Sequence, residues 1–316
     1  MKPELCLDRL ILERAKLYDT LLGLDEATLS TQPLCGAWTA KDVLAHIAGW
    51  EARAARRLPD LVAGRGMEIA DVPDVDAYNA ELVAQRQDLS LAGVLAELEE
   101  TLRSLARTFG ELPAAQQAEQ HRVPWGEVSA AGWVELEAGH DAEHAAAIAA
   151  WRREAQPTAA PGPSCLLQAA IRDARWAVAR LTGHMPPSAR DTIPLCGQWT
   201  AKDVVGHLAD WTATMAAAAA QAPHSGTLPA LPMDDEALEA WNGEHAMRRA
   251  MQPWHAVWAD YDAACRELLA TVEALGEQGL AQHIPGATPP ALYQWLALSG
   301  HDVEHARQML AWLQQA

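Results

Sequence analysis

Histidine spacing is the feature of this sequence that points most directly to chemistry. His140 and His144 lie four residues apart in "GHDAEHA", and on a helix this spacing puts both side chains on one face, about one turn apart. Two imidazoles so placed can bind one metal ion. A third candidate ligand, His46, lies on the apolar face of the predicted helix that contains "TAKDVLAHIAGW".

The same three histidines occur a second time. Residues 33–50, "PLCGAWTAKDVLAHIAGW", return as residues 194–211, "PLCGQWTAKDVVGHLADW", with thirteen of eighteen positions identical. The same offset of 161 residues aligns "GHDAEHA" with "GHDVEHA". His207, His301 and His305 therefore form a second set with the spacing of the first.

A metal ion explains these histidines better than core packing does. Taken singly, an inward-facing histidine is more often a hydrogen-bonded core residue than a ligand. Three of them side by side without a metal would need compatible tautomers and partners, and the repeat would need them twice. We predict one divalent ion at each set; Zn²⁺, Ni²⁺ and Fe²⁺ all suit three neutral imidazoles with an open coordination position.

Other residues are candidates for weaker reasons. Trp50 and Trp211 lie one turn beyond His46 and His207, where they could line a pocket or simply pack in the core. Asn79 and Asn242 each follow an aromatic residue and could reach such a pocket, although a turn or a helix cap is the default role for asparagine.

Three further features have ordinary structural roles. Cys35 and Cys196 recur before a glycine, which favours a turn over a reactive thiol. "HDAEH" satisfies the H-x-x-E-H pattern of zinc peptidases, but Glu143 next to a ligand on a helix points about 100° away from it. We expect Asp141 and Glu143 to be solvated or to hold a histidine ring nitrogen.

Helices must position these residues, because strand signatures are scarce and Ala, Leu, Glu and Arg recur at helical spacing. In the first half the pattern predicts helices near residues 3–23, 39–63, 76–87, 90–110 and 129–155. On the last of these, a stripe of helical period places the histidines on the buried side: Trp133, Leu136, His140, His144, Ile148 and Trp151.

Capping signals mark where several of these helices begin. Thr39 with Asp42, and Thr200 with Asp203, have the form of capping boxes. Ser129 and the Thr288-Pro289 pair are the expected starts of the last helix in each half. The simplest packing is a four-helix bundle with one long crossover between its second and third helices.

The repeat predicts two domains of one kind. We place the first at residues 1–155 and the second at residues 165–316, joined by the proline-rich linker 156–164. The expected fold class is all-α, as two tandem four-helix bundles. Because the two copies can bury against each other the surface that a single domain would use to dimerise, we expect a monomer with the architecture of a dimer.

Composition excludes several kinds of partner. The net charge of −18 repels nucleic acid and anionic lipid. Apolar runs fall short of the roughly 20 residues that cross a bilayer, and the first residues are too charged for a signal peptide. Five cysteines in an odd count, without paired spacing, fit reduced thiols. We expect a soluble, cytoplasmic protein that binds neither nucleic acid nor membrane.

"GAWTAKDVLAHIAGWE", followed about ninety residues later by "GHDAEHA", resembles the DinB/YfiT-like family of four-helix-bundle metalloproteins. This family includes mycothiol-dependent maleylpyruvate isomerases and related thiol transferases. The resemblance covers both halves and implies a bundle with a crossover, a divalent metal near one end of each bundle, and frequent dimerisation. Both histidine sets match the metal-binding histidines of the family, but the resemblance does not fix a substrate.

Three functions are compatible with these features. The leading hypothesis is an enzyme that acts on a small molecule, in which a low-molecular-weight thiol or water takes the open metal position and gives transferase, isomerase or hydrolase chemistry. The second is a non-catalytic binder or self-resistance protein with a structural metal. The third is an interaction protein in which the histidines no longer function. An open metal position beside a pocket would favour the enzyme.

Overall fold

The computed structural model describes residues 2–229, 235–285, 291–297 and 301–316. The chain divides into two compact units, Met1–Thr158 and Ala159–Ala316. Both are mostly helical, which confirms the predicted all-α class. The tandem relation of the two units, and their packing as a pair, stay predictions.

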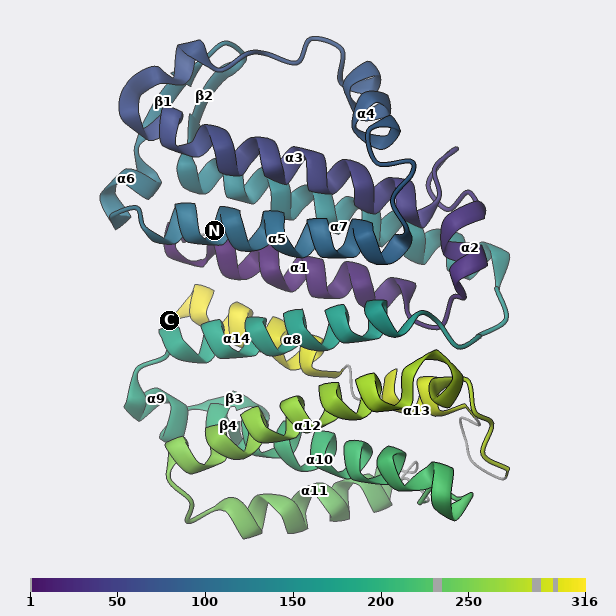
Figure 1. Cartoon of the computed structure of the whole chain (residues 1–316). Helices are drawn as coiled ribbons and strands as arrows, with labels where there is room; N and C mark the ends of the chain where they lie inside the picture. Colours follow the sequence, from purple (N-terminus) through teal and green to yellow (C-terminus); the bar gives the residue numbers. More distant parts are fainter. Residues whose placement is uncertain (1, 230–234, 286–290, 298–300) are drawn as a thin grey trace. The chain divides into compact units, whose positions relative to one another are not determined.

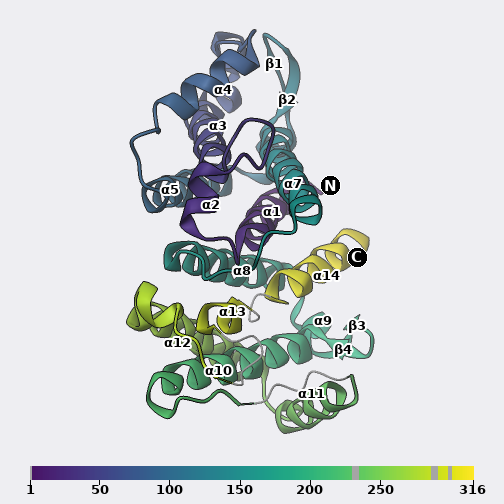
Figure 2. The ribbon, with the colours of Figure 1, turned by 90° about the vertical axis from the view of Figure 1, so that its right-hand side faces the viewer.

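The first unit contains the elements that follow, in chain order: η1 (Pro3–Leu5), α1 (Cys6–Leu21), α2 (Glu26–Thr31), α3 (Ala40–Asp60), η2 (Leu61–Arg65), η3 (Gly66–Glu68), α4 (Val75–Ala84), α5 (Leu91–Gly110), α6 (Ala114–Ala118), β1 (Gln120–Val123), β2 (Gly126–Ser129) and α7 (Ala130–Ala155). The long helices α1, α3, α5 and α7 run alongside one another (Figure 1). Helix α1 packs against α7 and α3 against α5, while α4, in the crossover, lies against α3 (Figure 2). This is the predicted bundle with its long second connection.

Side-chain caps fix where the helices that carry histidines begin. Thr39 Oγ1 accepts from the backbone N–H of Asp42 at 3.1 Å, and the Asp42 carboxylate accepts from the N–H of Thr39 at 3.0 Å. Ser129 Oγ accepts from the N–H of Gly132 at 2.9 Å. The predicted capping box on α3 and the predicted start of α7 are confirmed; the predicted start at Thr288-Pro289 lies outside the described residues.

A buried polar network ties the four long helices of the first unit together. Arg14 on α1 donates through Nε to Asp141 on α7 at 2.9 Å, and through Nη2 to Glu51 on α3 at 2.9 Å. Thr101 on α5 donates to the second carboxylate oxygen of Glu51 at 2.9 Å. Because Glu51 and Asp141 share α3 and α7 with the histidines, this network fixes how those two helices lie against each other.

The structure differs from the sequence prediction in its short elements. Helix α3 ends at Asp60, earlier than the predicted 63, and the chain then bends at Gly64, whose φ of 77° is easy for glycine. Helices α2 and α6 and the antiparallel hairpin of β1 and β2 were not predicted. The hairpin buries Val123 and Val128. Its tip carries Trp125.

The second unit contains α8 (Ser164–His184), α9 (Pro187–Thr192), β3 (Pro194–Cys196), β4 (Trp199–Thr200), α10 (Ala201–Ser225), α11 (Asp235–Arg249), α12 (Trp254–Leu280), α13 (Leu292–Ala297) and α14 (Asp302–Gln315). Helix α10 packs against α12, and α8 against α14 and α12. The predicted capping box of Thr200 and Asp203 begins α10.

The second unit stabilises its centre differently from the first. Asp302, which lies 161 residues after Asp141, is buried and accepts a hydrogen bond from the Tyr261 hydroxyl on α12. Arg175, at the same offset from Arg14, pairs with Asp262 instead. Among the described residues, no helix of either unit combines the length and the apolar character that crossing a membrane requires.

Candidate metal centres and an adjoining pocket

The histidines of the first set converge on one point. His46 comes from α3, and His140 and His144 from one face of α7. The Nε2 atom of His46 lies 3.0 Å from that of His140 and 3.1 Å from that of His144, and the last two are 3.1 Å apart. His46 is 1% exposed. The three ring nitrogens therefore form a nearly equilateral triangle in a mostly buried place.

Hydrogen bonds cannot satisfy such a triangle. A neutral imidazole nitrogen is either a donor or an acceptor, so at least two of three mutually contacting Nε2 atoms have the same character and repel. Metal-bound imidazole nitrogens lie about 2.0–2.1 Å from the ion, which puts neighbouring ligand atoms about 3.0–3.4 Å apart. The observed spacing fits this arrangement, and an ion would accept a lone pair from each ring.

Burial keeps these rings in the form that binds metal. Desolvation, followed by the neighbouring histidines, lowers the pKa of His46 to about 4 and that of His140 to about 3. Desolvation also lowers the pKa of His144. All three imidazoles are thus neutral at neutral pH, with lone pairs available for a cation.

The turn before α3 and the first turn of that helix orient two of the rings. His46 Nδ1 lies 3.3 Å from the backbone carbonyl of Asp42, which can only accept, so His46 is protonated at Nδ1 and has its lone pair at Nε2. Cys35 Sγ lies 3.6 Å from Nδ1 of His144, and the Trp38 ring packs against His46. Gly36 makes this turn possible with a φ of 61°. Cys35 was predicted only to be a turn residue, but its thiol also contacts a ring of the histidine set.

The second set has the same composition and a looser geometry. His207 comes from α10 and His305 from α14, while His301 is the N-cap of α14. Their ligand atoms lie within 4.8 Å of one another, with His207 and His301 at 2.9 Å between Nε2 atoms. Burial lowers the pKa of His207 to about 4 and that of His301 to about 3. Like the first, this set could hold a divalent ion.

The other predicted residues of the second unit lie around this set. Trp211 contacts the rings of Trp241 and His301. Asn242 partly offsets the lowering of the His207 pKa by burial. The buried Oδ1 of Asn242 and Nδ1 of His207 nevertheless form no hydrogen bond of normal geometry. His305 Nδ1 lies 3.0 Å from Oε1 of Gln308 on its own helix.

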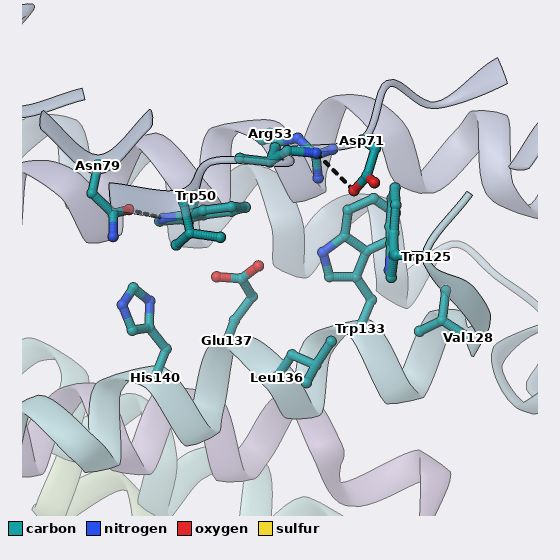
Figure 3. Close-up of a pocket in the computed structure, with 12 residues that line it drawn as sticks. Trp50, Arg53, Asp71, Asn79, Trp125, Val128, Trp133, Leu136, Glu137 and His140 are labelled. Atoms are coloured by element: carbon teal, nitrogen blue, oxygen red, sulfur yellow. Dashed lines mark hydrogen bonds between the residues drawn. The ribbon is translucent and has the colours of Figure 1, made fainter. Parts of the chain in front are cut away.

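A pocket of about 420 Å³ lies beside the first set. His140 is at one end of it, and the hairpin residues Trp125 and Val128 are at the other (Figure 3). The remaining lining residues come from α3, from the crossover with α4, and from α7: Trp50, Arg53, Asp71, Val72, Val75, Asn79, Trp133, Leu136 and Glu137. Since His140 also belongs to the histidine triangle, a molecule in this pocket would lie next to a metal bound there.

Sequence reasoning found part of this pocket. Trp50 and Asn79 both line it, and the indole N–H of Trp50 donates to Asn79 Oδ1 at 2.7 Å. Arg53 and Glu137 were missed. Each has a signal in the sequence: Arg53 lies three residues after Trp50, and Glu137 lies three residues before His140, so both share a helix face with a predicted residue.

Two expectations were wrong. Leu136 belongs to the stripe predicted to be buried, but it is 62% exposed because that part of α7 faces the mouth of the pocket. Asp141 is neither solvated nor bonded to a histidine ring, because its carboxylate is fully buried against Arg14. Glu143 is exposed, as expected for a residue that points away from the histidines.

One comparison with known proteins agrees with the fold of the first unit. The family model described as the mycothiol maleylpyruvate isomerase N-terminal domain matches residues 10–149, a segment within the first unit. The matched domain belongs to the DinB/YfiT-like superfamily, so this segment of the chain is similar to that superfamily, as its motifs indicated. Searches of curated proteins and of solved structures gave no match.

Proposed function

We propose that this protein is a metal-dependent enzyme that acts on a small molecule bound in the pocket of the first unit, by thiol-dependent transfer or isomerisation. One observation carries the proposal: His140 is part of both the histidine triangle and the pocket wall. Three histidine ligands leave a coordination position open, which is typical of catalytic rather than structural sites. The family match to the maleylpyruvate isomerase domain supports thiol chemistry.

Different residues of the first unit would bind the metal, position the substrate and exclude water. The triangle of His46, His140 and His144 would hold a divalent ion, and such an ion would supply the Lewis acidity that lowers the pKa of a bound thiol or water. Trp50, held by its hydrogen bond to Asn79, gives the substrate a fixed flat wall. The apolar lining excludes water from the reacting groups. If water took the place of the thiol, the same site would act as a hydrolase.

A turnover experiment tests the proposal. Metal-free protein would be reloaded separately with Zn²⁺, Ni²⁺ and Fe²⁺, and each form assayed for consumption of a low-molecular-weight thiol in the presence of a chlorodinitrobenzene electrophile. We expect thiol-dependent turnover that His140→Ala abolishes and His301→Ala, in the second unit, leaves in place. Turnover that is independent of the added metal would contradict the proposal. Ligand binding without turnover on any electrophile would favour the non-catalytic binder.

A further inference from the structure

The pocket of the first unit is built for a flat apolar body. Three indole rings, those of Trp50, Trp125 and Trp133, stand in its wall, and the Trp125 and Trp133 rings meet edge to face with centroids 6.0 Å apart. Its mouth exposes apolar surface, since Trp125 is 42% and Leu136 62% exposed. Exposed apolar side chains gathered around a concave site indicate a ligand that covers them.

Arg53 brings a positive charge into this apolar wall. Its guanidinium carbon lies 5.7 Å from the ring centroid of Trp50, 5.3 Å from that of Trp125 and 5.8 Å from that of Trp133. One amino group also donates to the backbone carbonyl of Ala70. Burial lowers the pKa of Arg53, but an arginine remains charged at neutral pH. The cation therefore lies among the three rings, and its bond to Ala70 helps to hold it there.

The acidic groups nearby leave room for a ligand anion at Arg53. Glu137, which Figure 3 shows between His140 and Arg53, is 5% exposed, and desolvation followed by Glu51 raises its pKa to about 8. Its carboxyl group is thus mostly uncharged at neutral pH. Asp71 lies beside Arg53 (Figure 3), but it is exposed on the crossover, where ion pairs are weak. A ligand carboxylate could replace it.

We propose that this pocket selects flat, apolar molecules that carry a single carboxylate, and that Arg53 is the residue that determines this specificity. The carboxylate pairs with the Arg53 guanidinium, and the flat body stacks on the tryptophan rings with its other end towards His140. A cationic ligand is disfavoured, because Arg53 already occupies the ring faces that would attract it. The proposal deepens the function proposed above and concerns the same site.

The second unit lacks this pair of residues. At the offset of 161, Thr214 stands where the first unit has Arg53, and the sequence has Leu298 in place of Glu137. The specificity is therefore assigned to the first unit alone, although both units carry a complete histidine set.

Calorimetric titration of the metal-loaded full chain with 2-naphthoate and with its neutral isostere 2-naphthamide tests the proposal. We expect 2-naphthoate to bind more tightly, and Arg53→Gln to weaken it about tenfold or more while leaving 2-naphthamide unchanged. Asp71→Asn should tighten 2-naphthoate binding, because it removes the competing anion. The matched control is Arg56→Gln, an exposed arginine on the same helix that does not line this pocket.

Equal binding of the two ligands, or equal weakening of both by Arg53→Gln, would overturn the proposal. Weaker naphthoate binding in Asp71→Asn would overturn it as well, and this variant keeps Arg53 and the wall of rings intact. Failure of the enzymatic proposal is distinguishable, since naphthoate selectivity without turnover leaves the ligand inference in place. Turnover without selectivity for the carboxylate removes this inference alone.

Discussion

At the scale of single residues, the two histidine sets differ in the group that contacts the Nδ1 atom of the third histidine, His144 or His305. In the first unit Nδ1 of His144 faces the Cys35 thiol at 3.6 Å, whereas in the second Nδ1 of His305 faces Gln308 at 3.0 Å. Groups that hold the far nitrogen of a ligand histidine fix its tautomer and orientation. The recurring cysteines of the sequence are therefore not equivalent, although they stand in identical motifs.

Cys35→Ala should weaken metal binding at the first set about tenfold. The affinity would be measured by competition with a chelator in a His301→Ala background, which leaves the first set intact. The matched control is Cys196→Ala in a His140→Ala background. There we expect no change, because Gln308 holds the ring. Equal losses in both pairs would show that the cysteines act on the turns and not on the histidines.

Residue types predicted the candidate ligands, but only part of the pocket wall, Trp50 and Asn79. Spacing indicates the histidines, since two imidazoles at i and i+4 suit a shared metal ion and the pair recurs 161 residues later. Arg53 and Glu137 share helix faces with Trp50 and His140, but this spacing is a weaker signal, because a charged residue on a helix is solvated by default. Their burial comes from the hairpin tip at Trp125 and from the crossover, which fold over α3 and α7 from distant parts of the chain.

At the scale of elements, helical periodicity and capping residues predicted the long helices of the first unit to within a few residues at each end. The hairpin of β1 and β2 was not predicted, because strands of four residues are too short to show a clear alternating pattern. The buried polar network around Arg14 was not predicted either. The sequence feature that could have indicated it is Arg14 itself, a charged residue in the apolar stripe of Leu10, Leu17 and Leu21 on α1.

Arg14→Leu should destabilise the protein strongly. Removing the guanidinium takes the buried cation of the network away from the carboxylates of Glu51 and Asp141, although Glu51 keeps its hydrogen bond from Thr101. Breaking a buried ion pair in this way costs about 3–5 kcal/mol. Urea unfolding measures the loss. Arg103→Ala, which breaks an exposed ion pair with Glu99 in the same unit, is the control and should cost less than about 1 kcal/mol. A similar cost for both would contradict a structural role for the network.

At the scale of the whole molecule, the duplicated motifs predict that the chain does not form a dimer. If each unit covers the surface that a single domain would use to dimerise, the protein is a monomer. Light scattering coupled to size exclusion should then give the chain mass of 34.2 kDa. A mass of about twice that value would show that the units leave a dimerisation surface free.

The central claim is that each histidine set holds one divalent ion, and metal content tests it most directly. Protein purified without a metal-affinity column would be analysed for its elements, before and after adding Zn²⁺, Ni²⁺ or Fe²⁺. We expect close to two ions per chain, one per chain in His46→Ala and in His305→Ala, and none in the double variant. A content near zero that does not rise with added metal, or an equal content in all four proteins, would contradict the account.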